Sequence, residues 1–591
     1  MKQILIVSLV VLVTSCKLSN TNPGKESNKE LAVLFDNYYE ERLKLFPLEA
    51  TAIGDNRYND LLPVDFSESY RITVKEFFKR YKTNISKFDP EVLSEQDKLS
   101  YDVFNREMAI NVESFDFQEN YIPFQQFWGL PLSMGQLGSG DGNQPFKTVK
   151  DYEHWLQRAG KFVAWSDSAI VYFKKGIATN YMLPKTLVLK IIPQMKAMLV
   201  KDDTSSLFFN PIKKFPKEFN DADKSRLTQE YVNLIHNQLL PTYKKLGDFL
   251  QTEYLPKARE TSGISALPDG KNYYQFLIRT QTTTNKTSEE IYQTGLAEVA
   301  RIGRLQDSLK NAVGFKGDMA AFFEYMKTDK KFMPYKQPGE ILAAFEALHQ
   351  RIKPNLAKMF NHAPKTPFEI RQTEAYRAAS ASAEYNQGSP DGSRPGIFYV
   401  PILDATQFNT TTGMESLFLH EAIPGHHYQI SLQQEDTTLP KFRRFGGNNA
   451  YIEGWALYCE SLGKELGLYT DPFQYMAALG DEMHRALRLV IDVGLHTKNL
   501  TREEAIQYMM AHEAAGEQYA TMEVERYMAI PGQALGYKIG ALKIAELRSK
   551  YQQQIGSKFS LATFHDNILK DGCLPLETLE KKMDRWAKSV K

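Results

Sequence analysis

Apolar residues recur at helical spacing along almost the whole chain, and this pattern constrains the fold more than any other feature. Several long segments place apolar side chains three or four positions apart, with polar residues between them. These segments lie near residues 31–46, 67–88, 93–112, 148–176, 224–258, 287–314 and 338–361. Turn-forming sequences such as Asp89-Pro90 and Pro268-Asp269-Gly270 separate them. The sequence therefore predicts a mainly α-helical protein.

Composition limits the partners and the number of domains. The 591 residues include 72 basic and 71 acidic side chains, a balance that argues against nucleic acid as a partner because nucleic acids require clustered positive charge. Hydrophobic content of 42% favours a globular core. Length alone would allow about four domains of roughly 150 residues. We expect instead two helical halves, residues 30–362 and 363–591, around one deep central cleft.

The N-terminus has the features of a bacterial export signal. Lys2 precedes a short apolar run, and Val13-Thr14-Ser15-Cys16 resembles a lipobox, which implies cleavage before Cys16 and lipidation of its thiol. The alternative is an ordinary secretory signal with an incidental cysteine. On the lipobox interpretation residues 1–15 are the signal peptide and 16–29 a polar tether. We then expect a lipoprotein of the bacterial cell envelope, held to the lipid bilayer through Cys16, at the outer membrane or facing the periplasm.

Two further cysteines, Cys459 and Cys573, remain in the chain. They do not form a disulfide scaffold and lack the spacing of a zinc finger. A single disulfide between them is possible, but nothing in the sequence requires one. The core must therefore be large enough to stabilise the fold by itself.

The helical pattern is interrupted after residue 363. A turn-rich stretch from Gly388 to Gly396 leads into Ile397-Phe398-Tyr399-Val400-Pro401, which is typical of a strand. Pro401 would end this strand or place it at the edge of a sheet. An edge strand around Tyr399 could pair with an extended peptide backbone and so bind substrate.

The helix that follows carries the chemistry, in the sequence His420-Glu421-Ala422-Ile423-Pro424-Gly425-His426-His427. Zinc peptidases commonly place two histidines one helical turn apart, with a glutamate after the first. The histidines bind Zn²⁺, and the glutamate takes a proton from the attacking water. Here the second histidine comes late: on a straight helix His426 would lie roughly 120° from His420.

Pro424 and Gly425 offer a way to bring a later histidine back. Proline removes a backbone donor and glycine tolerates unusual dihedral angles, so the helix must kink or bulge between the histidines. If two residues are extruded, His426 takes the second ligand position; if three are extruded, His427 does. The alternative is that these histidines are ordinary polar residues at a helix break.

A third ligand is expected on a nearby helix, between Asn449 and Glu460. Glu453 and Glu460 lie seven residues apart on one face. Glu453 is surrounded by apolar and aromatic residues, where an unpaired carboxylate would be costly. Glu460 lies nearer the polar end and fits a solvated charge better. We therefore favour Glu453 as the ligand.

These motifs resemble the bacterial proteins grouped as domain of unknown function 885. The matching stretches are His420–His427, Tyr451–Tyr458, Asp492–His496 and Pro531–Tyr537, and the resemblance is strongest from about 390 to 545. That family is thought to be related to helical gluzincins such as thermostable carboxypeptidases and thimet-type oligopeptidases. The relation implies a zinc-dependent peptidase with a cleft between helical halves. Because the second histidine of many gluzincins follows a glycine, it favours His426 over His427.

The resemblance also implies roles for further residues. Glu421 would act as general base, and Tyr537 would donate to the developing oxyanion, unless it is only a packed aromatic residue. Asp492 and His496 would support or complete the metal site. Arg488 and Arg526 are candidates for binding a peptide carboxylate, although structural arginines are the alternative.

Two other functions use the same features. The first is hydrolysis of a non-peptide amide, which would need the same site. The second is a catalytically silent lipoprotein that binds peptides or glycans. Retention of Glu421 beside His420 favours catalysis, because a binding protein has no use for the base.

Overall fold

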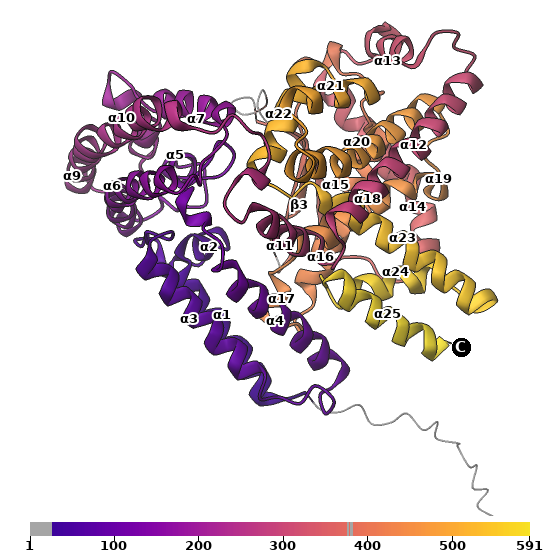
Figure 1. The fold of residues 1–591 in the computed structure, drawn as a ribbon, viewed down its shortest axis with the longest axis horizontal. Coiled ribbons are helices and arrows are strands. Elements are labelled where there is room, and N and C mark those ends of the chain that lie inside the picture. The colour runs from indigo at the N-terminus through magenta and orange to yellow at the C-terminus, as the bar shows by residue number, and fades with distance from the viewer. Residues whose placement is uncertain (1–26, 375–377, 379–381, 390, 591) are drawn as a thin grey trace, which may run out of the picture.

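The computed structural model describes residues 27–374, 378, 382–389 and 391–590. The expected signal peptide, Cys16 and most of the expected tether lie outside this part of the chain. Figure 1 shows two groups of helices, an N-terminal group and a larger one that contains the C-terminus. No helix among the described residues is long and apolar enough to span a bilayer.

The N-terminal group contains the first ten α-helices. Side chains that accept hydrogen bonds from free backbone N–H groups define several of their starts, such as Ser94 for α4 and Thr148, in a capping box with Asp151, for α6. The helices are α1 (Lys29–Leu45), α2 (Pro47–Ala52), α3 (Glu68–Ile85), α4 (Glu95–Ser114), α5 (Leu130–Gly138), α6 (Val149–Ala178), α7 (Lys185–Ala197), α8 (Asn210–Lys213), α9 (Asp221–Leu234) and α10 (Leu240–Phe249). The predicted helical segments in this region are thus confirmed, with small shifts at their ends.

Four helices connect this group to the rest of the molecule. They are α11 (Gly270–Thr282), α12 (Ser288–Ala312), α13 (Met319–Thr328) and α14 (Pro338–Met359). They precede residue 362 but lie with the C-terminal helices in Figure 1. The structure thus groups these four helices with the C-terminal helices, across the expected boundary at 362. The physical reason is that α12 has an apolar face, with Ile291 and Ile302 fully buried, and it packs along α20 (Pro472–Thr497).

A small three-stranded sheet precedes the histidine motif at residues 420–427. It contains β1 (Phe368–Gln372), β2 (Glu384–Asn386) and β3 (Gly396–Val400), in the order β1-β3-β2. The predicted strand is β3, and its existence is confirmed. However, β3 pairs with β1 in parallel and with β2 antiparallel, so it is the central strand. The expected edge position is wrong because each side of β3 already has a partner.

The remaining helices form the larger group. They are α15 (Met414–Glu421), α16 (His426–Glu435), α17 (Lys441–Arg444), α18 (Asn449–Ser461), α19 (Gly463–Leu466), α20, α21 (Arg502–His512), α22 (Glu517–Ala529), α23 (Leu535–Ile555), α24 (Leu561–Leu569) and α25 (Leu576–Val590). Helices α18 and α23 pack with little space between them, because a Cβ on Gly454 would lie 2.5 Å from the Cα of Gly540. This contact holds α18 in place.

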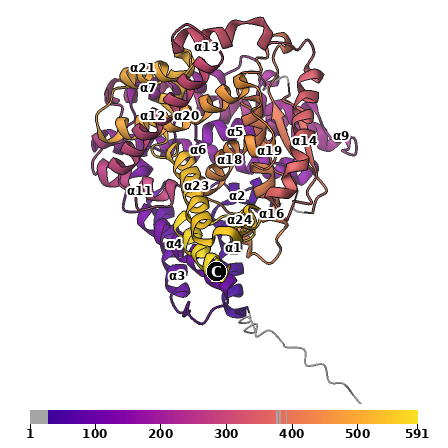
Figure 2. The same cartoon turned by 90° about the vertical axis from the view of Figure 1, so that its right-hand side faces the viewer.

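The two groups share a continuous core and enclose cavities. One apolar cluster runs from Leu62 of the N-terminal group to Ala534 near the start of α23. A cavity of about 640 Å³ lies between α1 and α4 on one side and residues 442–449 on the other. A second, of about 940 Å³, lies between α22 and residues such as Gln126 and Lys190. At the lower end of the view in Figure 2, α25 lies beside α4, where Arg585 pairs with Glu95.

Candidate metal centre

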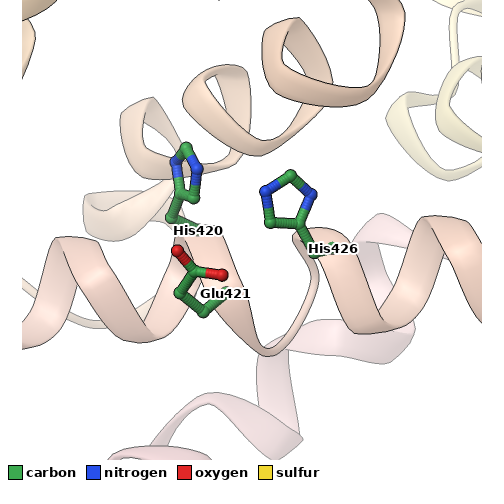
Figure 3. A group of neighbouring side chains, drawn as sticks. All are labelled: His420, Glu421 and His426. Atoms are coloured by element: carbon green, nitrogen blue, oxygen red, sulfur yellow. The ribbon is translucent and has the colours of Figure 1, made fainter. Parts of the chain in front are cut away.

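The break between α15 and α16 brings His420 and His426 together. Helix α15 ends at Glu421, four residues form turns, and α16 begins at His426. The two imidazole rings are perpendicular, with centroids 4.8 Å apart. One possible ligand atom from each of His420, Glu421 and His426 lies within 4.8 Å of the other two (Figure 3). The predicted interruption of the helix is confirmed, and it places His426 beside His420.

Gly425 makes this turn possible. A Cβ at this position would lie 1.9 Å from the carbonyl oxygen of His420, closer than any side chain tolerates. The turn is also held from outside, because the Nε1–H of Trp455 donates to the carbonyl of Pro424 at 2.9 Å. The Sγ of Cys459 lies 3.5 Å from the same oxygen. Helix α18 therefore fixes the turn that positions both histidines.

Helix α18 also supplies a carboxylate to the same point. The Oε2 atom of Glu453 lies 3.5 Å from Nε2 of His420 and 3.5 Å from Nε2 of His426. Ligands at about 2.0–2.1 Å from a tetrahedral metal are separated by about 3.4 Å. The donor types of these three residues suit zinc, and the two distances from Glu453 are close to those between ligands of a tetrahedral site.

Glu460 contacts His420 at Nδ1, the ring nitrogen that is not near Glu453. Its Oε1 atom lies 2.7 Å from Nδ1 of His420, and its side chain is only 7% exposed. The interpretation of Glu460 as a solvated charge is therefore wrong: two helical turns beyond Glu453, on the same face of α18, this side chain lies inside the core. A carboxylate on Nδ1 fixes the ring orientation and directs Nε2 towards Glu453, as is common behind metal-binding histidines. The seven-residue spacing of the two glutamates was the signal in the sequence.

The charges in the centre support one another. Burial raises the pKa of Glu453, but hydrogen bonds and charge interactions with His420 and His426 lower it by more and hold it well below its usual range. Burial lowers the pKa of His420, yet Glu453, Glu460 and Glu421 together raise it well above its usual value. The carboxylates of Glu421, Glu453 and Glu460 thus stabilise a positive charge at His420. The same negative charge would favour a bound cation.

Glu421 is half-buried, and its carboxylate makes no hydrogen bond or ion pair with any residue in the described part of the chain. In Figure 3 it lies beside His420, on the side of the pair where the chain turns towards His426. A carboxylate held close to a metal-type site but left unpaired can accept a proton.

His427 faces the other way. Its Nδ1 lies 3.0 Å from the hydroxyl of Tyr385 on β2, and its ring packs against Phe368 of β1 with centroids 4.9 Å apart. Burial lowers the pKa of His427 to about 4, so the ring is neutral. His427 therefore packs α16 against the sheet, which leaves His426 as the residue beside His420.

Asp492 and His496 have partners away from the two histidines. Asp492 accepts from the hydroxyl of Tyr274 at 2.5 Å and from the backbone N–H of Gly532 at 3.1 Å. The Nδ1 of His496 accepts from the N–H of Ile264, and its Nε2 donates to the carbonyl of Tyr527, both at 3.0 Å. Neither residue supports His420; in the described structure Glu460 does.

The remaining candidates are Tyr537, Arg488, Arg526 and Tyr399. The guanidinium of Arg488 lies 4.7 Å from the centre of the Tyr537 ring, and no hydrogen bond of the Tyr537 hydroxyl occurs among the described residues. Arg526 donates to Gln533 at 2.8 Å and contacts Glu523. Tyr399 lies on the central strand, so its backbone is not free to pair with a peptide.

Comparisons with known proteins identify the family of this chain and solved structures with a similar fold. The sequence profile of the family described as "Bacterial protein of unknown function (DUF885)" matches residues 47–583. The fold is similar to "the putative lipoprotein from Colwellia psychrerythraea", with a TM-score of 0.87 and 28% identity over 95% of this chain and 99% of that one. It is also similar to "a putative lipoprotein of unknown function from Shewanella oneidensis", with a TM-score of 0.74 and 18% identity over 94% and 99%. No protein with a curated description matches the chain.

Proposed function

Because this chain belongs to the DUF885 family of bacterial proteins, whose name carries no activity, we propose a function from the site itself: a zinc-dependent peptidase. One observation carries the proposal. One carboxylate oxygen of Glu453 lies 3.5 Å from Nε2 of His420 and 3.5 Å from Nε2 of His426, close to the separation of ligands on a tetrahedral metal. Next to them stands the unpaired carboxylate of Glu421.

In this proposal His420, His426 and Glu453 hold the metal, and Glu460 orients His420. Bound zinc supplies a Lewis acid that polarises the scissile carbonyl and makes water acidic enough to attack at neutral pH. Glu421 takes the proton of the attacking water and passes it to the leaving amine. The free hydroxyl of Tyr537 is our candidate for the second donor to the developing oxyanion.

The same site would serve hydrolysis of other amides, and an inactive relative could use it to bind peptides. The unpaired state of Glu421 supports catalysis, because a carboxylate kept for structure would be hydrogen-bonded like Glu460. Zinc content measured together with turnover of a degenerate peptide mixture tests the proposal. Zinc bound at one equivalent with peptide turnover supports it. Zinc without turnover of peptides would leave a hydrolase of other amides or a binding protein.

For localisation we propose anchoring through lipidated Cys16. The solved structures similar to this chain are described as putative lipoproteins, which supports an envelope location. Replacing Cys16 with Ser should release the protein from membrane fractions, since lipid would be its apolar anchor. Retention of the variant after a high-salt wash would contradict this proposal.

A further inference from the structure

Two arginines on α20 each have a buried guanidinium nitrogen without an acceptor in the described structure. Arg485 and Arg488 lie one helical turn apart, and their guanidinium groups lie 5.7 and 4.7 Å from the centre of the Tyr537 ring. Arg485 makes no hydrogen bond or ion pair with any residue that the structure describes, and its buried Nε has no acceptor. Both side chains therefore present cationic groups around one aromatic ring.

Arg488 is the more deeply buried of the two. Its side chain is 5% exposed, its Nη2 donates to Glu523 at 2.9 Å and its Nε to the hydroxyl of Tyr527 at 3.2 Å. Its Nη1 is buried and has no acceptor within the described chain. Buried guanidinium nitrogens are normally hydrogen-bonded, so this Nη1 is a donor available to a bound group.

The arginine pair is connected to the metal centre and to open space. The carboxylate of Glu460, which binds His420 at 2.7 Å, also acts electrostatically on Arg485. Tyr519 of α22, which interacts electrostatically with both arginines, lines the cavity of about 940 Å³ between the two groups of helices. One wall of this cavity therefore lies near the two arginines, whereas His420, His426 and Glu453 are not among its lining residues.

We propose that Arg485 and Arg488 bind a carboxylate of the substrate, and that this carboxylate is the free C-terminus of a peptide. The inference rests on the proposed peptidase function and specifies its substrate class. Guanidinium groups bind carboxylates through paired, charge-assisted hydrogen bonds, and the orphaned Nη1 of Arg488 and Nε of Arg485 are the donors available for this. Arg526 is not included, because its Nη1 and Nη2 donate to Glu523 and Gln533 and none of its nitrogens is buried without an acceptor in the described structure.

Three degenerate mixtures of N-acetylated pentapeptides test the proposal: free acids, the matching C-terminal amides, and free acids made without Asp and Glu. Cleavage by the zinc-loaded protein is followed by mass spectrometry. Binding of fluorescent versions to the Glu421→Gln protein is followed by anisotropy. We expect free acids to be cleaved near their C-termini and bound at least about tenfold better than amides. The third mixture should behave like the first, because the terminal carboxylate suffices.

Arg485→Gln is the decisive variant, because this side chain makes no hydrogen bond or ion pair with a described residue that the substitution would break. It should bring the acid-to-amide ratio close to one in cleavage and in binding. Arg526→Gln is the matched control and should leave the ratio unchanged. Equal cleavage of acids and amides, or a preference that depends on Asp and Glu, would overturn the inference and leave the peptidase proposal standing. No cleavage of any mixture would refute the peptidase proposal, and the binding ratio in wild-type and Arg485→Gln protein would still decide the carboxylate site.

Discussion

Two regions of the larger helical group contain buried histidines and carboxylates, but they use these residues differently. In the metal-type centre of α15, α16 and α18, the Nε2 atoms of His420 and His426 face one carboxylate oxygen at 3.5 Å. On α20, both nitrogens of His496 are occupied by backbone groups at 3.0 Å. The first arrangement leaves room for an ion, whereas the second is complete without one.

The comparison teaches that residue type and burial do not identify a binding site. Asp492 and His496 were candidates for the metal site because of their chemistry, yet Tyr274, Gly532, Ile264 and Tyr527 satisfy their hydrogen-bonding groups. Polar atoms that lack a hydrogen-bond partner are the better criterion for a binding site. By that criterion the centre at His420 and the arginine pair on α20 are open, and the Asp492–His496 region is structural.

The largest effect is expected at the proposed base. Glu421→Gln should lower peptide turnover at least about 10²–10⁴-fold, because the amide cannot accept a proton. Zinc content and fold should persist, since the side chain is nearly isosteric and is not one of the proposed ligands. Turnover and metal content measured on the same preparation check this. A variant that keeps most of its turnover would refute the assigned role.

The next effect separates two neighbouring histidines. His426→Ala should lose zinc, because it removes one of three proposed ligands. His427→Ala should retain zinc at one equivalent and lose thermal stability, because it removes the contacts of α16 with Tyr385 and Phe368. Competition with a chelator measures both. The reverse pattern would show that His427 is the ligand and that the observed turn is not the functional one.

A smaller effect is expected behind the metal centre. Glu460→Gln should weaken zinc binding by about 10–100-fold, the usual range for a residue that orients a ligand. Asp492→Asn is the matched control from the other region and should leave zinc affinity unchanged. If both variants weaken zinc binding equally, the distinction between the metal centre and the Asp492–His496 region fails.

The smallest effect concerns pH and stability. Burial raises the pKa of Asp492 to about 7, although Tyr274, the N–H of Gly532 and Arg488 act against this shift. The unfolded chain has a value near 3.9, so the folded state binds the proton more tightly, and this contribution to stability is lost as pH rises through about 7. From pH 5 to 8 the loss should be on the order of 2 kcal/mol. Thermal melts of wild-type and Asp492→Asn protein should show a steeper decline for wild type; parallel curves would contradict this origin.

Much of the fold could be predicted because helical periodicity is a local signal. The segments near 149–178 and 288–312 end within a few residues of the predicted limits. The break at Pro424-Gly425 was also predictable, since it follows from the stereochemistry of two residues. The packing of α12 with the C-terminal helices could not be predicted, because contacts between distant helices do not change the spacing of apolar residues along the sequence.

The site was predicted in part for the same reason. His420, Glu421 and His426 lie within seven residues, and Glu453 was found by its apolar surroundings. The role of Glu460 was missed because its sequence neighbours suggested a solvent-exposed helix end, whereas tertiary packing leaves it 7% exposed. The central position of β3 was missed because β1 and β2 are short and carry weak patterns.

The central claim is that His420, His426 and Glu453 bind one zinc ion. Anomalous diffraction from crystals of the protein grown with zinc, recorded above and below the zinc absorption edge, tests it most directly. We expect one strong peak at about 2.0–2.2 Å from Nε2 of both histidines and from a carboxylate oxygen of Glu453. A peak at His496 instead, or no peak between α15, α16 and α18 with zinc in excess, would contradict the claim.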